Sequence, residues 1–168
     1  MSSTGVGTLI RPLTGADRAR VEAMTRGTPL FRSEEIPVAL DEFNAAIGVG
    51  RPADPDYETA GAEVDGVLTG WICWGPTPCT RGTFDLYWIV VDTASQGQGI
   101  GGALVAEMER RVRGRARLIV VETAGRPDYA PTRAFYSGLG YQVASTIPDY
   151  YAPGDDLVVF VKRIADSG

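Results

Sequence analysis

Apolar residues recur at helical spacing immediately after a glycine-rich segment of the chain. They are Ile100, Leu104, Val105, Met108 and Val112, with charged residues between them. This spacing predicts an amphipathic helix over residues 100–112. Two earlier helices are predicted, one from Thr14 or Asp17 to about residue 24 and one from a Ser33 cap to Gly48. A short fourth helix is predicted over residues 132–138.

Runs of β-branched and aromatic residues predict the strands. The strongest run, TFDLYWIVV, covers residues 83–91, and the continuously apolar ARLIVVET at 116–123 fits a strand covered on both faces. Asp65-Gly66 has the composition of a tight hairpin turn between two strands. Further strands are predicted at 8–13, 141–147 and 157–164, the last two joined by a loop over residues 148–156. The order of elements, without repeats or a linker, predicts one mixed α/β domain over residues 1–168.

Composition narrows the classes of function. The chain has 168 residues, 44% hydrophobic and 22% charged, which suits one globular domain with a core. Asp and Glu outnumber Lys and Arg by 21 to 16, so no nucleic-acid partner is expected. The chain has no histidine, which excludes a Ser-His-Asp triad and a His-ligated zinc site. Cys73 and Cys79 are expected to be reduced thiols, and no metal site is predicted.

The sequence also bears on location. The amino-terminal segment lacks the pattern of a signal peptide, and no apolar run approaches the length of a membrane span. We therefore expect a cytoplasmic protein without a membrane partner.

The segment SQGQGIGG, residues 95–102, supports two interpretations. As Gly97-x-Gly99-x-x-Gly102 it matches the GxGxxG of a dinucleotide-binding fold, with Glu122 as a candidate ribose ligand. As Gln96-x-x-Gly99-x-Gly101 it matches the pyrophosphate loop of acyl-CoA-dependent acetyltransferases. Both place backbone N–H groups around a phosphate at a helix N-terminus.

Three details weigh against the dinucleotide interpretation. Five residues separate Val91 from Gly97, whereas a dinucleotide-binding strand leads almost directly into its first glycine. Too little chain remains for the further parallel strands and a substrate domain. The preceding segment is also rich in hairpins, unlike the start of a βαβ series.

The segment VDTASQGQGIGGALV resembles the central motif of the GNAT superfamily of N-acetyltransferases, V-x-P-x-x-Q/R-x-x-G-x-G/A followed by a helix. It departs from that motif at Thr93 and at Gln98. The segment TRAFYSGLGY is similar to the family's A-x-x-x-Y-x-x-x-G-F/Y motif, and DYYAPGDD is similar to the ending of RimI-like protein N-terminal acetyltransferases. The resemblance covers about residues 8–164.

The resemblance implies a GNAT fold. This is a twisted, mostly antiparallel α/β sheet of about seven strands, splayed between the fourth and fifth and flanked by about four helices. It also implies acetyl-CoA as cofactor, held by backbone amides after the fourth strand and by the segment around the second motif. The implied cofactor-binding residues are Ile89, Val91, Gln96, Gly97, Gln98, Gly99, Ile100, Gly101, Gly102, Tyr129, Thr132 and Arg133.

Three residues are candidates for the chemistry of acetyl transfer. Tyr136 aligns with the family's general-acid tyrosine. Asp85 aligns with a glutamate base of histone-acetylating members, and Glu122 at the end of the next strand is its competitor. An alkylammonium must lose its proton before it attacks, directly or through water, to a carboxylate or to a water chain held by the backbone. Structural explanations compete in each case: core packing for Tyr136, a solvent-facing strand start for Asp85, and a loop cap for Glu122.

The expected acceptor is a primary amine of a small metabolite or of an amino-acid-like or peptide substrate. By resemblance it enters between two loops, which carry Phe31 and the pair Tyr150 and Tyr151; Asp85 and Glu122 complete the candidate substrate-binding set. Attack is expected in a direct ternary complex, and a second copy of the chain is a candidate partner. The alternative is a catalytically silent acyl-CoA-binding sensor.

Overall fold

The computed structural model describes residues 7–165, which divide into two compact units. The first contains the described residues up to Trp74 together with Trp88–Arg111, and the second contains Gly75–Tyr87 and the residues from Val112 onward. The seven strands follow the order β1-β2-β3-β4-β5-β7-β6, and β4 (Thr83–Val91) contributes residues to both units. The predicted order of strands and helices is confirmed.

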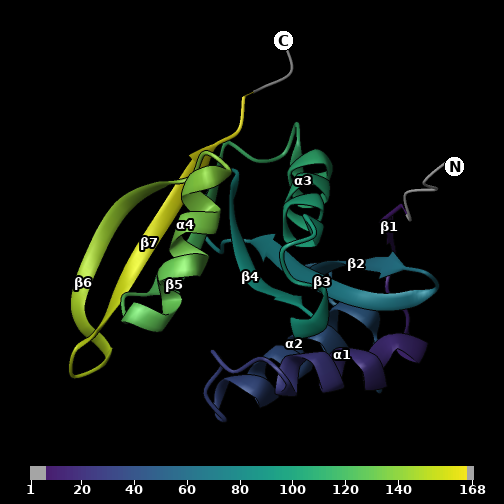
Figure 1. The fold of residues 1–168 in the computed structure, drawn as a ribbon. Coiled ribbons are helices and arrows are strands. Elements are labelled where there is room, and N and C mark those ends of the chain that lie inside the picture. Colours follow the sequence, from purple (N-terminus) through teal and green to yellow (C-terminus); the bar gives the residue numbers. More distant parts are fainter. Residues whose placement is uncertain (1–6, 166–168) are drawn as a thin grey trace, which may run out of the picture. The chain divides into compact units, whose positions relative to one another are not determined.

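The first unit is a set of antiparallel strands with helices on both faces. Figure 1 shows α1 and α2 on one side of β2 and β3, and α3 on the other. Its elements are β1 (Leu9–Arg11), α1 (Arg18–Arg26), α2 (Glu35–Ile47), β2 (Glu58–Val64) and most of β3 (Val67–Pro76) and α3 (Ile100–Val112). The buried Trp71 packs edge-on against Phe43 of α2 at 5.8 Å between ring centroids, and its Nε1 donates to the Thr25 hydroxyl.

The turn between β2 and β3 is the two-residue hairpin predicted from Asp65-Gly66. Both residues have positive φ, 52° and 77°, which is the conformation that this pair of residue types favours. The hairpin aligns Val64 with Val67 and Glu63 with Leu68, and a one-residue register shift between Glu63 and Ala62 precedes the pairs from Ala62↔Gly70 to Glu58↔Trp74.

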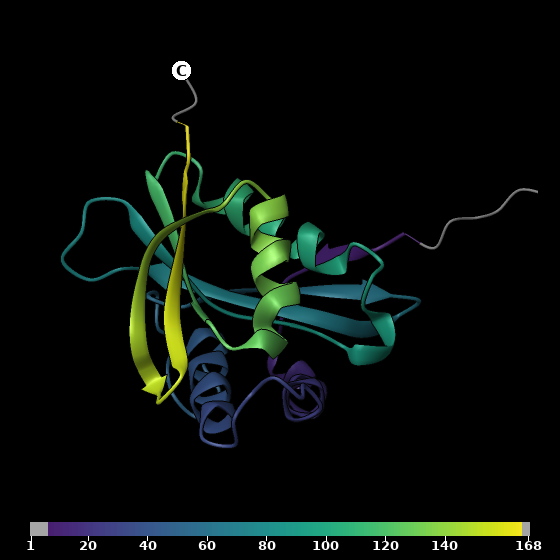
Figure 2. The same cartoon turned by 60° about the vertical axis from the view of Figure 1, so that its left-hand side comes forward.

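The second unit is built on β5 (Leu118–Ala124), β7 (Asp155–Arg163) and β6 (Gln142–Ala152), paired antiparallel in that order. The start of β4 pairs parallel with β5, from Thr83↔Leu118 to Leu86↔Val121, and both strands continue beyond these pairs. Helix α4 (Ala130–Gly138) lies beside β5 and β7 (Figures 1 and 2). Its Tyr136 ring packs on Phe160 of β7, with centroids 6.0 Å apart.

Two local predictions were wrong. Ser33 does not cap α2: its hydroxyl donates to the Glu34 carboxylate, while the Glu35 carboxylate accepts the Arg32 N–H at 2.7 Å and holds the helix start. Residues 148–152 are not loop but the end of β6, and only residues 153 and 154 form the turn. Tyr150 and Tyr151 therefore lie in a strand.

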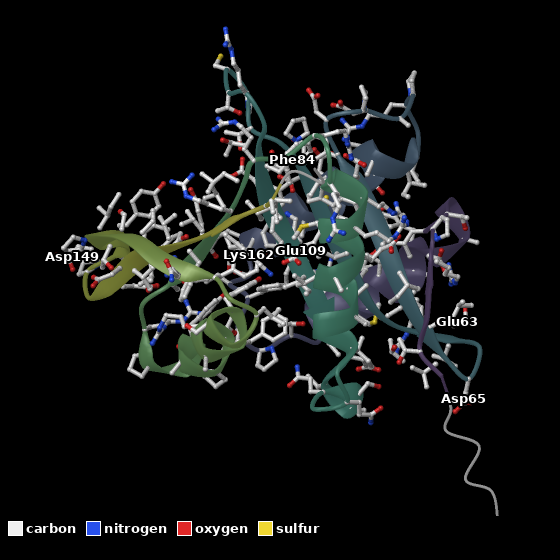
Figure 3. All side chains as sticks on the ribbon, turned by 90° about the horizontal axis from the view of Figure 1, so that it is seen from above. Glu63, Asp65, Phe84, Glu109, Asp149 and Lys162 are labelled. Carbon is white, nitrogen blue, oxygen red and sulfur yellow. The ribbon has the colours of Figure 1, made fainter. Side chains whose placement is uncertain are left out.

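Pro148 misled the second prediction because proline usually interrupts a strand. It is tolerated here because β6 is an edge strand, with one side of its backbone unpaired. Asp149 (φ 53°) marks an irregularity near the turn end of the β6–β7 hairpin, where Figure 3 shows it. Its carboxylate accepts the Gly154 N–H, and the Asp156 carboxylate accepts the Asp149 N–H.

Candidate active site

The loop between β4 and α3 is anchored at its first residue. The Asp92 N–H donates to the Thr69 carbonyl at 2.8 Å, and the Asp92 carboxylate pairs with the Arg20 guanidinium at 2.5 Å. The Ser95 N–H returns to the Asp92 carbonyl, closing a 3-10 turn over Thr93–Ser95. The chain therefore enters the glycine-rich segment from a fixed point, and sequence reasoning did not identify the Arg20–Asp92 pair.

The glycine-rich segment leads into the N-terminus of α3 and leaves backbone N–H groups there without hydrogen-bond partners. Gly97 and Gly99 both have φ +79°, and the first intrahelical bond runs from the Ala103 N–H to the Gly99 carbonyl. The N–H groups of Ile100, Gly101 and Gly102 precede that bond, as the first amides of any α-helix do. Residues 96–99 are exposed. The segment thus presents unpaired amides and the positive end of a 13-residue helix, which suits a phosphate.

Gly102 distinguishes the two interpretations of this segment. In a dinucleotide-binding loop the third glycine permits close packing of helix on strand. A Cβ built at Gly102 meets no atom within 4 Å. No close approach requires a glycine at this position, so the geometry disfavours the dinucleotide interpretation.

The glycine that permits close packing of α3 on the sheet is instead Gly70 of β3. A Cβ there would lie 3.0 Å from the Val90 carbonyl oxygen and 3.1 Å from Leu104 Cδ1. We expect Gly70→Ala to lower the free energy of unfolding by about 1–3 kcal/mol, the usual cost of overpacking. Gly102→Ala, with open space around its Cβ, should instead raise it by about 0.4–1 kcal/mol. Urea denaturation of both variants measures the difference, and equal effects would contradict this account of the packing.

Side chains on β4 alternate between buried and half-buried except at residues 87–89, which are all half-buried. Phe84, Leu86 and Val90 are buried, while Ile89 and Val91 are half-buried. The Gln96 side-chain amide lies 3.4 Å from the Val91 carbonyl, and Gln98 is exposed.

The second unit holds both candidate bases. Half-buried Asp85 accepts a hydrogen bond from the Thr77 hydroxyl at 2.6 Å. Asp85 pairs with Val120 across the parallel strands, and Glu122 is two residues further along β5. The Glu122 side chain stays exposed, yet partial desolvation and, secondarily, the charge of Asp85 raise its pKa. A carboxyl with a raised pKa is better suited to accept a proton near neutral pH.

Tyr136 of α4 has a buried ring, only 2% exposed. It contacts Phe135 and Tyr141 edge-on, at 5.1 Å and 5.7 Å between centroids. Its hydroxyl forms no hydrogen bond within residues 7–165. Burial raises the pKa of this hydroxyl, so the group holds its proton. The phenol is therefore fixed in position and protonated, as a general acid must be before it acts.

The remaining predicted cofactor residues lie around the start of α4. The Arg133 guanidinium donates to the Ala124 and Arg126 carbonyls at 2.7 Å and 3.0 Å, tying α4 to the end of β5. The Tyr129 ring lies under the Arg126 guanidinium at 4.7 Å, and Thr132 is half-buried. Arg133 thus has a structural role that the sequence did not indicate, and its contact with the cofactor stays a prediction.

The predicted substrate residues fall in both units. Phe31 belongs to the first, where it packs edge-on against Trp88 at 5.5 Å. Tyr150 and Tyr151 belong to the second and contact each other edge-on at 5.0 Å. The structure adds two residues that sequence reasoning missed: the Trp88 indole donates to the Glu42 carboxylate of α2 at 2.6 Å. Glu42 is one of several acidic residues in the predicted helices and belongs to no sequence motif, so the sequence alone offered no reason to select it.

No helix within residues 7–165 is long and apolar enough to cross a bilayer.

Comparison with known proteins agrees with this geometry. The model of the acetyltransferase (GNAT) family matches residues 24–141. A GNAT-family protein of known structure from Desulfovibrio desulfuricans is 35% identical, with a TM-score of 0.87 over 95% of this chain and 100% of that one. Blasticidin-S acetyltransferase from Streptomyces morookaense is 36% identical over 80 residues, which is 48% of this chain and 55% of that protein. The match thus spans little more than half the length of that relative.

More distant structures share the fold. The ribosomal-protein-S18-alanine N-acetyltransferase of Escherichia coli has a TM-score of 0.76 at 19% identity, over 96% and 97% of the two chains. The acetyltransferase yncA of Salmonella typhimurium, solved with acetyl-CoA, has a TM-score of 0.72 at 20% identity over 96% of each chain. The family match, covering well over half of the chain, together with the shared seven-stranded fold, shows that this chain belongs to the GNAT family of acetyltransferases.

Proposed function

We propose that this protein transfers an acetyl group from acetyl-CoA to a primary amine of a small metabolite or of an amino-acid-like or peptide substrate. The observation that carries the proposal is the set of unpaired amides at the N-terminus of α3, in a family with a member solved with acetyl-CoA. The likeness to a blasticidin-S acetyltransferase favours a small-molecule acceptor.

The chain's own groups divide the work. The amides of Gly97–Gly102 bind the pyrophosphate, with the α3 dipole favouring its negative charge. A backbone N–H near Ile89 polarises the acetyl carbonyl. Glu122 or Asp85 accepts the proton of the ammonium, directly or through water. The amine nitrogen then forms a bond to the acetyl carbon, the carbon–sulfur bond breaks, and Tyr136 gives its proton to the departing thiolate.

Direct transfer is favoured because the chain offers no activated thiol. Burial, with the nearby charges of Glu42 and Glu58, raises the pKa of Cys73 well above its usual value. Cys79 is exposed, and the sequence has no histidine to activate either thiol.

An assay of thiol release from acetyl-CoA, across panels of amines and peptides, tests the proposal. Turnover with an amine acceptor supports it. Tight acetyl-CoA binding by calorimetry without turnover on any acceptor would favour a silent acyl-CoA-binding module instead.

The pH profile should separate the two candidate bases. A base acts only when deprotonated, so kcat/KM should fall as pH drops through the raised pKa of Glu122. Asp85→Asn removes a charge that contributes to that shift and should move this acid limb to lower pH. Glu122→Gln should abolish the limb and lower kcat. An acid limb that persists unchanged in Glu122→Gln would exclude Glu122 as the base.

A further inference from the structure

Glu42 is a half-buried carboxylate in the first unit without a cation beside it. It lies on α2, and its one hydrogen bond within residues 7–165 comes from the Trp88 indole N–H at 2.6 Å. It forms no ion pair with any residue in this described part of the chain. Carboxylates removed from water are usually paired with a positive charge, so this one is an exception that needs an explanation.

Aromatic and acidic groups lie near Glu42, and the nearby Arg51 guanidinium is bound to Asp41. Trp88 is itself half-buried, and the Phe31 ring stands perpendicular to it. The charge of Glu42 contributes to the raised pKa values of Tyr57 and buried Cys73. Desolvation is the main cause of the raised pKa of Glu42, and the charge of Asp41 adds to it. Such surroundings penalise a bare carboxylate and favour a bound cation, which aromatic faces also attract.

We propose that Glu42, with Trp88 and Phe31, binds a cationic group of the acceptor, so that the preferred acceptors carry a second positive charge. This inference rests on the proposed acetyl transfer for the identity of the ligand as an acceptor. The attacking nitrogen must be neutral to form its bond, so a carboxylate that holds a cation engages a different nitrogen. A diamine, or an amine bearing a guanidinium, has the required chemistry.

Trp88 connects the cation site to β4, the strand that carries one of the proposed catalytic groups. Trp88 immediately precedes Ile89, whose backbone is proposed to polarise the acetyl carbonyl. A cation held at Glu42 would therefore fix one end of the acceptor one residue along β4 from the Ile89 backbone. The competing explanation is that Glu42 only accepts the indole hydrogen bond, a task that a glutamine oxygen performs equally well.

Glu42→Gln separates the two explanations. The glutamine keeps a side-chain oxygen that accepts the indole hydrogen bond, and it removes the negative charge. The probes are butane-1,4-diamine and butylamine, which differ by one ammonium group. We expect the KM for the diamine to rise about tenfold or more, as for the loss of a partly buried charged pair. The KM for butylamine, the KM for acetyl-CoA and kcat at saturation should stay within about twofold. The exposed Glu34→Gln is the matched control for net charge and should change neither KM.

A binding measurement makes the result independent of turnover. Trp71 and Trp74 are buried, so the diamine should perturb the intrinsic fluorescence of half-buried Trp88 in wild type and not in Glu42→Gln or Trp88→Phe. Equal affinity of wild type and Glu42→Gln for the diamine, with folding verified by circular dichroism, overturns the inference while leaving acetyl transfer intact. Diamine binding that depends on Glu42, without transfer to any acceptor, would instead remove the proposed function and leave only the cation site.

Discussion

Tyr136→Phe should lower kcat by about 100-fold while leaving the fold and the affinity for acetyl-CoA unchanged. General acids typically contribute a factor of about 10²–10⁴, and phenylalanine keeps the ring while removing the proton. The ring contacts with Phe135, Tyr141 and Phe160 persist in the variant. The hydroxyl donates to no other group within residues 7–165, so its removal leaves no unsatisfied partner there. Single-turnover kinetics with saturating acetyl-CoA measures the chemical step.

The matched control for this variant is Tyr141→Phe, because Tyr141 is equally buried and belongs to the same aromatic cluster. Its kcat should stay near that of wild type. Because burial raises the pKa of Tyr136, the group stays protonated throughout the assay range, and an alkaline limb in the wild-type profile must come from another group. Unchanged single-turnover rates in Tyr136→Phe would remove the tyrosine from the mechanism.

The sequence predicted most where one short pattern determines one local conformation. The hairpin at Asp65-Gly66 and the helix end at Gly48 both require positive φ, and both were identified from residue type alone. The glycine loop before α3 was found in the same way. These features depend on a positive φ, which few residue types adopt, so the residue type alone indicates the backbone conformation.

The sequence predicted less where contacts between distant segments determine the local structure. Pro148 suggested a loop, yet edge pairing with β7 extends β6 through Tyr150 and Tyr151. Glu42 and Trp88 are 46 positions apart, and neither belongs to a motif. Their contact depends on how α2 packs beside the end of β4, which local pattern does not encode. Residues that recognise a substrate are often of this kind, because they are set by packing between elements distant in sequence.

Gly99→Val should weaken acetyl-CoA binding by about 100-fold. Gly99 has φ +79°, a conformation that costs a β-branched residue about 1–3 kcal/mol, so the chain should rearrange to relieve it. A Cβ at this position meets no atom within 4 Å, so the effect comes from the backbone and not from a collision. Turning two amides away from the pyrophosphate forfeits two charge-assisted hydrogen bonds, about 1.5–3 kcal/mol each, which accounts for the expected factor.

Gly154→Val controls for the strain itself. Gly154 has the same φ of +79° and the same open surroundings, but it lies in the turn between β6 and β7. Both variants should lose similar stability in thermal denaturation, and only Gly99→Val should lose affinity for acetyl-CoA by calorimetry. If Gly99→Val binds acetyl-CoA as tightly as Gly154→Val does, the amides at the N-terminus of α3 do not hold the pyrophosphate. If wild type instead binds NAD more tightly than acetyl-CoA, the loop is a dinucleotide site. Strain and ligand binding are thus separated by two glycines of equal conformation in different parts of the chain.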